Sequence, residues 1–186
     1  EKGSQHNLLS IMDDFDDYDL EHWAGVLTLD TLLANTDRHQ DNWGIIFQRN
    51  LSGKVIKPKF SPAFDNGTAM EYSVQEDNFH KFDNPIKLKA YLENSRKARH
   101  HMKWSLDETN NLCFYEFVLR YTLKYPDSKD IIYKHLRFER GQLEDILNPL
   151  CDIVTDHKYK LSRERLNFMI DMLFHRKDLL IKTLGL

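Results

Sequence analysis

The chain has 186 residues, a formal net charge of -3 at pH 7 and 41% hydrophobic residues. This length and apolar content fit one domain that buries a core of its own. The slightly acidic balance argues against direct nucleic-acid binding. No apolar run reaches the length of a membrane-spanning helix, so we expect no membrane partner.

The first residues are predicted to form a polar lead over 1–18. The chain starts at Glu1 rather than Met and carries an acidic run at 13–17. We interpret the run as a solvated lead into a helix N-terminus, where carboxylates favour the helix dipole, with a charged docking segment as the alternative. The start also leads us to expect a piece cut from a longer chain, with an upstream lobe absent.

A buried helix is predicted over residues 19 to about 35. Apolar residues recur there with helical spacing, namely Leu20, Trp23, Ala24, Leu27 and Leu32. Such a helix is a rigid support that delivers a polar loop at its C-terminal end.

That loop, residues 35–42, reads Asn-Thr-Asp-Arg-His-Gln-Asp-Asn. Asp37 and Asn42 have the D-x-x-x-x-N spacing of a protein-kinase catalytic loop, although D-R-H replaces the usual H-R-D. A carboxylate near an attacking hydroxyl orients it and accepts its proton, so Asp37 is the candidate general base. For Arg38 we favour a bridge to Asp41 or another acid over binding of a phosphorylated residue.

A β-hairpin is predicted after the loop. The strands are expected at 43–47 and 55–60, joined by a turn at 48–54. Because proline cannot donate to a strand ladder, Pro58 and Pro62 predict a second strand that is short or at an edge.

The hairpin is also predicted to gather two metal ligands. Antiparallel pairing brings Asn42, before the first strand, near Asp65, after the second. Mg²⁺ prefers oxygen ligands together with substrate phosphates, so this amide and carboxylate are candidate ligands for Mg²⁺ and ATP. Gly67 is expected to let the chain turn tightly behind Asp65. The alternative is that Asn35, Asp37 and Asn42 only cap the helix and tie down the loop.

These residues resemble the C-terminal lobe of HipA-like kinases, bacterial serine/threonine kinases that are often the toxin half of a toxin-antitoxin pair. The resemblance rests on the D-R-H-x-x-N-x-G loop and the S-P-A-F-D-N-G-T segment at 61–68. It implies that Asp37 is the catalytic aspartate and that Asn42 and Asp65 are magnesium ligands. His39 stands where the family loop also has a histidine near the phosphates, and we assign it to the catalytic group.

The resemblance further implies an activity and partners. The expected reaction is transfer of the γ-phosphoryl group of Mg-ATP to a protein serine or threonine hydroxyl. A helix-turn-helix antitoxin is the expected partner, and an aminoacyl-tRNA synthetase is a candidate substrate. The two cysteines, Cys113 and Cys151, lie far apart in helical patterns, which predicts free buried thiols and a cytoplasmic location.

The segment after the D-x-G turn is less regular. By analogy with kinases, we interpret residues 68–94 as an activation-type segment that contains a short helix opened by a proline. Residues 95–104 form a basic cluster with Trp104, which either grips an acidic, phosphorylated or nucleic-acid partner or is a solvated loop. The adjacent His100 and His101 lack further ligands at zinc-like spacing, so we expect no metal site there.

The remainder is predicted to be helical. A capping box at 105–108 opens a helix that continues to about Tyr125 and is stopped by Pro126. Its core candidates are Leu106, Cys113, Phe117, Leu119 and Leu123. Further helices are expected at 128–138, 142–147 and 162–184, the last with Gly185 as its C-cap.

We therefore predict a mainly α fold, a kinase-like C-terminal lobe with one small β-hairpin at its active edge. One domain covers 1–186, with the lead at 1–18, the catalytic segment at 19–70 and a helical subdomain at 71–186. The predicted function is that of a protein serine/threonine kinase. Three alternatives stay open: a phosphoinositide-type lipid kinase, although D-N-G replaces its usual D-F-G; a non-catalytic kinase-like interaction module; and a helical domain that binds nucleic acid through the 96–104 cluster.

Overall fold

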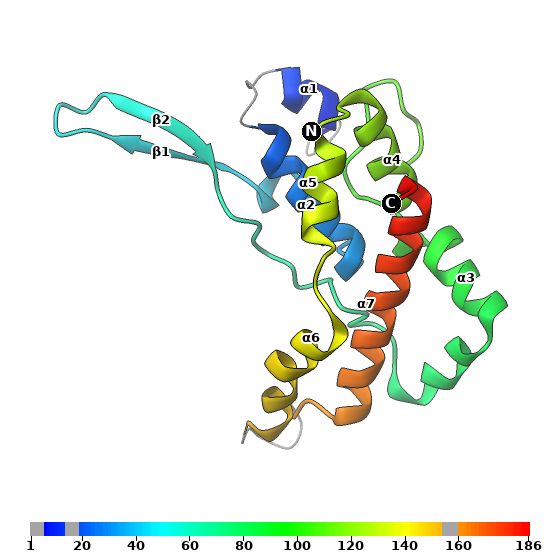
Figure 1. Cartoon of the computed structure of the whole chain (residues 1–186). Helices are drawn as coiled ribbons and strands as arrows, with labels where there is room; N and C mark the ends of the chain where they lie inside the picture. The colour runs from blue at the N-terminus through cyan, green and yellow to red at the C-terminus, as the bar shows by residue number, and fades with distance from the viewer. Residues whose placement is uncertain (1–5, 14–18, 154–159) are drawn as a thin grey trace.

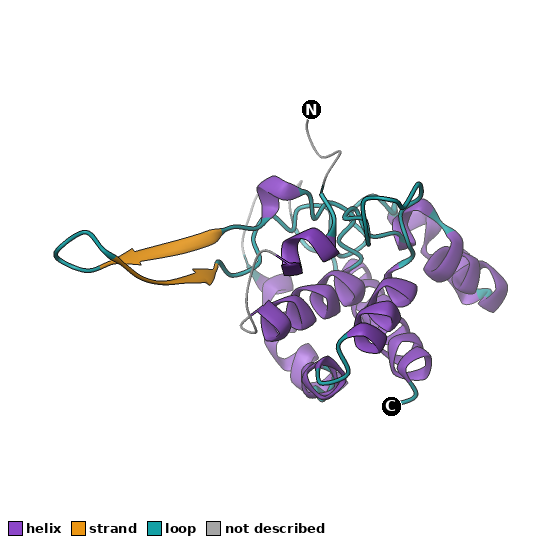
Figure 2. Cartoon of the chain, turned by 90° about the horizontal axis from the view of Figure 1, so that it is seen from above, coloured by secondary structure: helices purple, strands orange, loops and turns teal. Residues whose placement is uncertain are grey.

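The computed structural model describes residues 6–13, 19–153 and 160–186. Most of the predicted acidic run at 13–17 therefore lies outside the described residues. The fold is mainly α, with one β-hairpin that extends away from a body of helices (Figures 1 and 2), as predicted. No helix in the described ranges has the length and apolar content that a membrane crossing needs.

The order of elements along the chain is as follows. The helices are α1 (Leu8–Asp13), α2 (Asp19–Leu33), α3 (Pro85–Asn94), α4 (Phe114–Lys124), α5 (Ser128–His135), α6 (Arg140–Leu147) and α7 (Arg163–Leu184). The strands are β1 (Ile45–Arg49) and β2 (Val55–Phe60). The short 3-10 helices in the described ranges are η1 (Gln40–Asn42), η2 (Glu76–Asp83), η3 (Arg96–Ala98) and η4 (Asn148–Asp152).

Helix α2 is the centre of the body and packs against α4, α5 and α7. The predicted Trp23, Ala24 and Leu27 are fully buried in the main core cluster. Polar side chains on the same helix are buried as well, and the Thr28 and Thr31 hydroxyls donate to carbonyl oxygens one turn earlier. A helix that is buried on most sides fits the predicted role of a rigid support for the loop at its end.

The hairpin is a two-stranded antiparallel sheet in which Ile45 pairs with Phe60 and Phe47 pairs with Pro58. Both strands are edges, which accommodates Pro58 as predicted. At its base, the Phe60 ring stacks on His22 with ring centroids 4.3 Å apart. Farther out, Phe47 is 58% exposed. The hairpin is thus anchored at its base and open along its length (Figure 2).

Helix α4 begins at Phe114, so the predicted start at 105 is wrong. Residues before it hold another loop in place, since the Asn111 amide donates to the carbonyl oxygens of His100 and His101. This tertiary role prevails over the local capping-box signal. As a result Leu106 is 58% exposed instead of buried.

Other predictions for the helical region are mostly confirmed. Phe117 is fully buried, but Leu123 faces outward and is 73% exposed. Helix α7 begins after Ser162, whose hydroxyl accepts from the Arg165 N–H, and ends at Gly185, whose φ is 61°. Both cysteines are free, with Cys151 buried and Cys113 only partly buried.

A buried ion pair fastens the segment after the D-x-G turn to α7. The Arg176 guanidinium contacts the Glu71 carboxylate, and both side chains are at most 3% exposed. The other Glu71 oxygen accepts from the Tyr91 hydroxyl at 2.5 Å. Burial, together with the Glu71 charge, raises the pKa of Tyr91. The ion pair ties the predicted activation-type segment to α7, and the hydrogen bond ties the start of that segment to α3 at its end.

Replacing Arg176 by methionine is expected to destabilise the protein by about 3–5 kcal/mol, because Glu71 would stay buried without its cation. Urea unfolding measures the change. The matched control is Arg163→Met, which removes a pair with Asp152 whose side chains are 60% and 71% exposed. That control should cost less than about 1 kcal/mol. Equal losses in the two variants would contradict the anchoring role of Arg176.

His22 gives the stability a pH dependence. Burial, helped by the Arg38 charge, lowers the pKa of His22 to about 4. In the unfolded chain His22 is protonated below about pH 6.5, whereas in the folded chain it is protonated only below about pH 4. The free energy of unfolding therefore decreases as the pH falls from about 6.5 to about 4. His22→Phe keeps a ring against Phe60 and should reduce that loss, measured by urea unfolding at several pH values. The same change at the exposed His80 should leave the loss unaltered; an unchanged profile in His22→Phe would contradict the assignment.

Candidate active site

The polar loop starts with a residue in the left-handed region, because Ala34 has a φ of 51°. The next residue, Asn35, is fully buried. Its amide group donates to Asp30 Oδ1 at 3.0 Å and its Oδ1 accepts from the Thr68 hydroxyl at 2.9 Å. Asn35 therefore joins the end of α2 to the segment that follows the hairpin.

Arg38 is the hub of the site and is fully buried. Its guanidinium donates to both carboxylate oxygens of Asp30, at 3.0 and 2.7 Å. It also donates to the carbonyl oxygens of Asn42 and Phe64, each at 2.8 Å, and to Asn66 Oδ1 at 2.7 Å. One side chain thus joins α2, the polar loop and the D-x-G segment. The predicted bridge to an acid is confirmed in kind, with Asp30 as the acid instead of Asp41.

Asp30 carries the charge that Arg38 needs. Burial alone would raise the pKa of Asp30, but hydrogen bonds from His100 and Arg38 outweigh it and hold the pKa below its ordinary value. His100 Nδ1 accepts from the Met102 N–H at 3.1 Å, so Nε2 carries the proton that faces Asp30 Oδ2 at 3.4 Å. The stability that this depressed pKa contributes is present above about pH 4 and is lost as the pH falls.

Asn42 is 2% exposed and its amide nitrogen donates to the Asp37 carbonyl oxygen at 2.7 Å. Because only the nitrogen can donate, this bond fixes the orientation of the amide and directs its oxygen away from Asp37. Asn42 therefore ties down the loop, as the structural alternative expected. Its role as a metal ligand stays a prediction.

The Asp37 carboxylate lies in a cluster of imidazoles. His39 Nε2 is 4.0 Å from Asp37 Oδ1, and His101 Nδ1 is 3.9 Å from the same oxygen. Asp37 is 41% exposed, so a substrate hydroxyl can reach it. On its other nitrogen, His39 accepts from the Asp41 N–H at 3.2 Å and caps η1. The accessible Asp37 carboxylate thus lies near one histidine of its own loop and another from elsewhere in the chain.

Asp65 is exposed and has a φ of 52°. The left-handed turn is therefore made by the aspartate itself, and the expectation that Gly67 makes it is wrong, since Gly67 does not have a left-handed φ. The non-glycine residues with positive φ in the described ranges are Ala34, Asp65, Met70 and Glu71. All four flank the polar loop and the D-x-G segment, and such conformations persist only where surrounding contacts hold them.

The structure brings together the predicted loop and D-x-G residues, because Arg38 bonds to the backbone of Asn42 and of Phe64, next to Asp65. The sequence did not identify Asp30, Asn66, His100 or His101 as parts of this site. For the two histidines the only signal was their adjacency within the basic cluster.

Part of the basic cluster is buried although Arg96 and Arg99 are exposed, so the predicted solvated loop is only partly correct, and binding of a partner stays a prediction. His100 and Met102 are buried, and the Trp104 ring contacts Phe117 edge-on at 5.6 Å. Trp104 is therefore part of the core packing, which leaves it unsuited to stacking on a nucleic-acid base. The segment packs beside the site, where His100 and His101 face Asp30 and Asp37.

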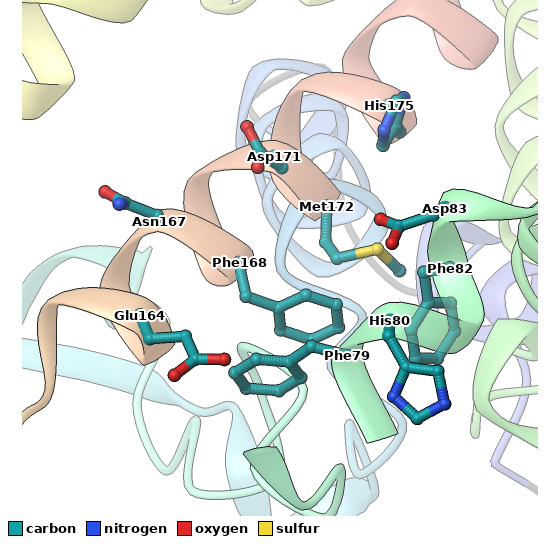
Figure 3. Close-up of a pocket in the computed structure, with 10 residues that line it drawn as sticks. All are labelled: Phe79, His80, Phe82, Asp83, Glu164, Asn167, Phe168, Asp171, Met172 and His175. Atoms are coloured by element: carbon teal, nitrogen blue, oxygen red, sulfur yellow. The ribbon is translucent and has the colours of Figure 1, made fainter. Parts of the chain in front are cut away.

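A surface cavity of about 380 Å³ lies between η2 and α7. Figure 3 shows the rings of Phe79 and Phe168 next to each other, with Glu164 beside Phe79 and Asp83 near Phe82. The two stacked rings have centroids 3.8 Å apart. None of the predicted site residues lines this cavity. We therefore place the candidate site at the polar loop and not here.

Comparisons with known proteins bear on the fold. No protein-family description and no curated protein matches the chain. Among solved structures, the chain is similar to the Helicobacter pylori proinflammatory kinase CtkA, with 22% sequence identity and a TM-score of 0.64. The match covers 89% of this chain and 52% of that kinase chain, so the chain spans about half the length of CtkA. The chain thus has the fold of a kinase-like C-terminal lobe; the HipA-like resemblance stays a prediction.

Replacing Arg38 by lysine is expected to destabilise the protein by at least about 2 kcal/mol, because an ammonium cannot reproduce the fork of donors and leaves buried acceptors unpaired. Urea unfolding measures the loss. The control is Arg49→Lys on the hairpin, where the guanidinium makes an exposed bond to the Gly53 carbonyl oxygen. That change should cost less than about 0.5 kcal/mol. An unfolding free energy of Arg38→Lys equal to that of the parent protein would contradict the central role of Arg38.

Proposed function

We propose that the protein is an ATP-dependent kinase that transfers the γ-phosphoryl group to a serine or threonine hydroxyl of a protein. The observation that carries the proposal is the set of Arg38 hydrogen bonds, which assembles the D-R-H-x-x-N loop and the D-N-G segment into one site beside an exposed carboxylate. The kinase-like fold supports it.

Asp37 acts as the general base in this proposal. Its carboxylate orients the attacking hydroxyl and accepts its proton, a contribution typically worth about 10²- to 10⁴-fold in rate. The backbone carbonyl of Asp37 is held by the Asn42 amide at 2.7 Å. Since positioning supplies much of the rate in phosphoryl transfer, a loop held in this way suits the reaction.

Asn42 and Asp65 are the proposed ligands for Mg²⁺, which would neutralise charge on the phosphates of ATP. An amide oxygen and a carboxylate fit the donor preference of this cation. Two features support this proposal: the amide orientation of Asn42 is fixed, and Asp65 is exposed where the D-x-G segment meets the loop. His39, which contacts both Asp37 and Asp41, is proposed to lie beside the phosphates.

The partners are proposed from the HipA-like resemblance. They are a helix-turn-helix antitoxin and a protein substrate, with an aminoacyl-tRNA synthetase as the candidate. A lipid acceptor is the alternative that the same loop motif supports, and the assay below separates the two.

The proposal is tested by transfer of radiolabel from γ-labelled ATP with Mg²⁺, using both the full product of the gene and this chain, with protein and phosphoinositide vesicles as acceptors. Asp37→Asn and Asp65→Asn should each lower transfer by about 10²-fold or more. Asparagine is chosen because it keeps the shape of both side chains and tolerates the left-handed φ at position 65.

The control is Asp83→Asn, an exposed aspartate outside the site, which should retain full transfer. Because Asp37 and Asp65 are exposed, both variants should also unfold within about 0.5 kcal/mol of the parent protein. Label on lipid alone would favour a lipid kinase. ATP binding without transfer by the full product would favour the interaction module, and unfolding of the variants would favour a purely structural loop.

A further inference from the structure

The loop at 99–103 enters the site from outside the predicted motifs. Asn111 holds it by donating to the carbonyl oxygens of His100 and His101, at 2.9 and 3.0 Å. Arg99 forms an isolated antiparallel bridge with Cys113, and its guanidinium donates to the Asn111 carbonyl oxygen at 2.7 Å. The backbone of this loop is therefore fixed on the α4 side before its side chains reach the site.

The two adjacent histidines of this loop face two carboxylates of the catalytic segment, Asp30 and Asp37. His100 is buried, stacks on Phe117 at 4.7 Å and faces Asp30 at 3.4 Å. His101 is 44% exposed and faces Asp37 at 3.9 Å. His100 thus contacts the buried ion pair that supports the site, while His101 contacts the proposed general base, Asp37.

His101 and His39 approach the same oxygen of Asp37. Their rings lie edge to face with centroids 5.8 Å apart, and both nitrogens point to Oδ1. Oδ1 is the Asp37 oxygen recorded in both contacts, which makes Oδ2 the candidate acceptor for a hydroxyl. Distances of 3.9–4.0 Å exceed direct hydrogen bonds, and such catalytic contacts commonly tighten once substrate is bound.

The charges around His101 come from several elements. Burial, followed by the neighbouring His39 and His100 imidazoles, lowers the pKa of His101, while the Asp37 carboxylate and the Thr36 backbone oppose this shift. His6, hydrogen-bonded to the Trp43 indole at 3.0 Å, is a fourth imidazole within electrostatic reach of His101. His101 is therefore largely neutral near pH 7, able to present one N–H and one lone pair.

We propose that His101 is a positioning residue of the site: with His39 it holds Oδ1 of Asp37, so that Oδ2 meets the substrate hydroxyl in a fixed orientation. This inference rests on the proposed kinase function. His101 lies outside both sequence motifs. Judged by its exposure alone, it would be taken for an ordinary surface residue.

The contact itself is tested without any activity, by following the imidazole resonances of the chain by NMR across about pH 4 to 8. Asp37→Asn removes the carboxylate that favours the imidazolium, so the His101 pKa should fall by about 0.5 or more. The matched control is Asp41→Asn, whose carboxylate lies 3.8 Å from His39 Nδ1, and this change should leave the His101 pKa unchanged. An unaltered His101 pKa in Asp37→Asn would overturn the proposal.

The catalytic consequence is tested in the full gene product with His101→Ala. We expect kcat to fall roughly 10- to 100-fold with KM for ATP nearly unchanged, because the base is misplaced while the nucleotide site is intact. His101→Gln, which keeps a donor, should recover part of the rate, and His80→Ala should have no effect. Undiminished kcat in His101→Ala would reject the positioning role alone, whereas absence of transfer by the parent product would reject the proposed function.

Discussion

The buried pair of Arg38 and Asp30 is the interaction on which the site depends. An arginine with no exposed surface is tolerated only when its charge and donors are matched, and here the guanidinium reaches three separate parts of the chain. Since Phe64 and Asn42 accept from the same nitrogen, the spacing of the loop and the D-x-G segment is set by the size of one guanidinium. Both segments are therefore hydrogen-bonded to a side chain that is ion-paired with α2.

The structural and catalytic interpretations of the polar loop turn out to be compatible. Asn35 and Asn42 do tie down the chain, as turn-forming residues often do. Asp37 and Asp65 remain exposed beside these hydrogen bonds, and the backbone at Ala34 and Asp65 is left-handed. Left-handed non-glycine residues often cluster at functional sites, which is consistent with the proposed role of this loop.

Elements whose formation depends on neighbouring residues in the sequence were predicted correctly. The hairpin follows from strand residues around a turn, and the end of α7 follows from Gly185. The partner of Arg38 was not predictable, because Asp30 lies in an apolar helical pattern that gives no sign of a buried charge. The approach of His101 to Asp37 was not predictable either, because it joins residues far apart in sequence. The predicted start of α4 was wrong for a similar reason, since Asn111 makes long-range hydrogen bonds to the loop at 99–103 instead of belonging to a helix.

The open hairpin has a consequence for how the chain could be divided. Asn42 precedes β1 and Asp65 follows β2, yet the two ends of the hairpin are held together by Arg38 and not only by the strands. Leu51 at the tip is fully exposed. The covalent connection at the tip is thus dispensable for the geometry at the base, and it is the natural place for a split protein, a circular permutation or an inserted reporter domain.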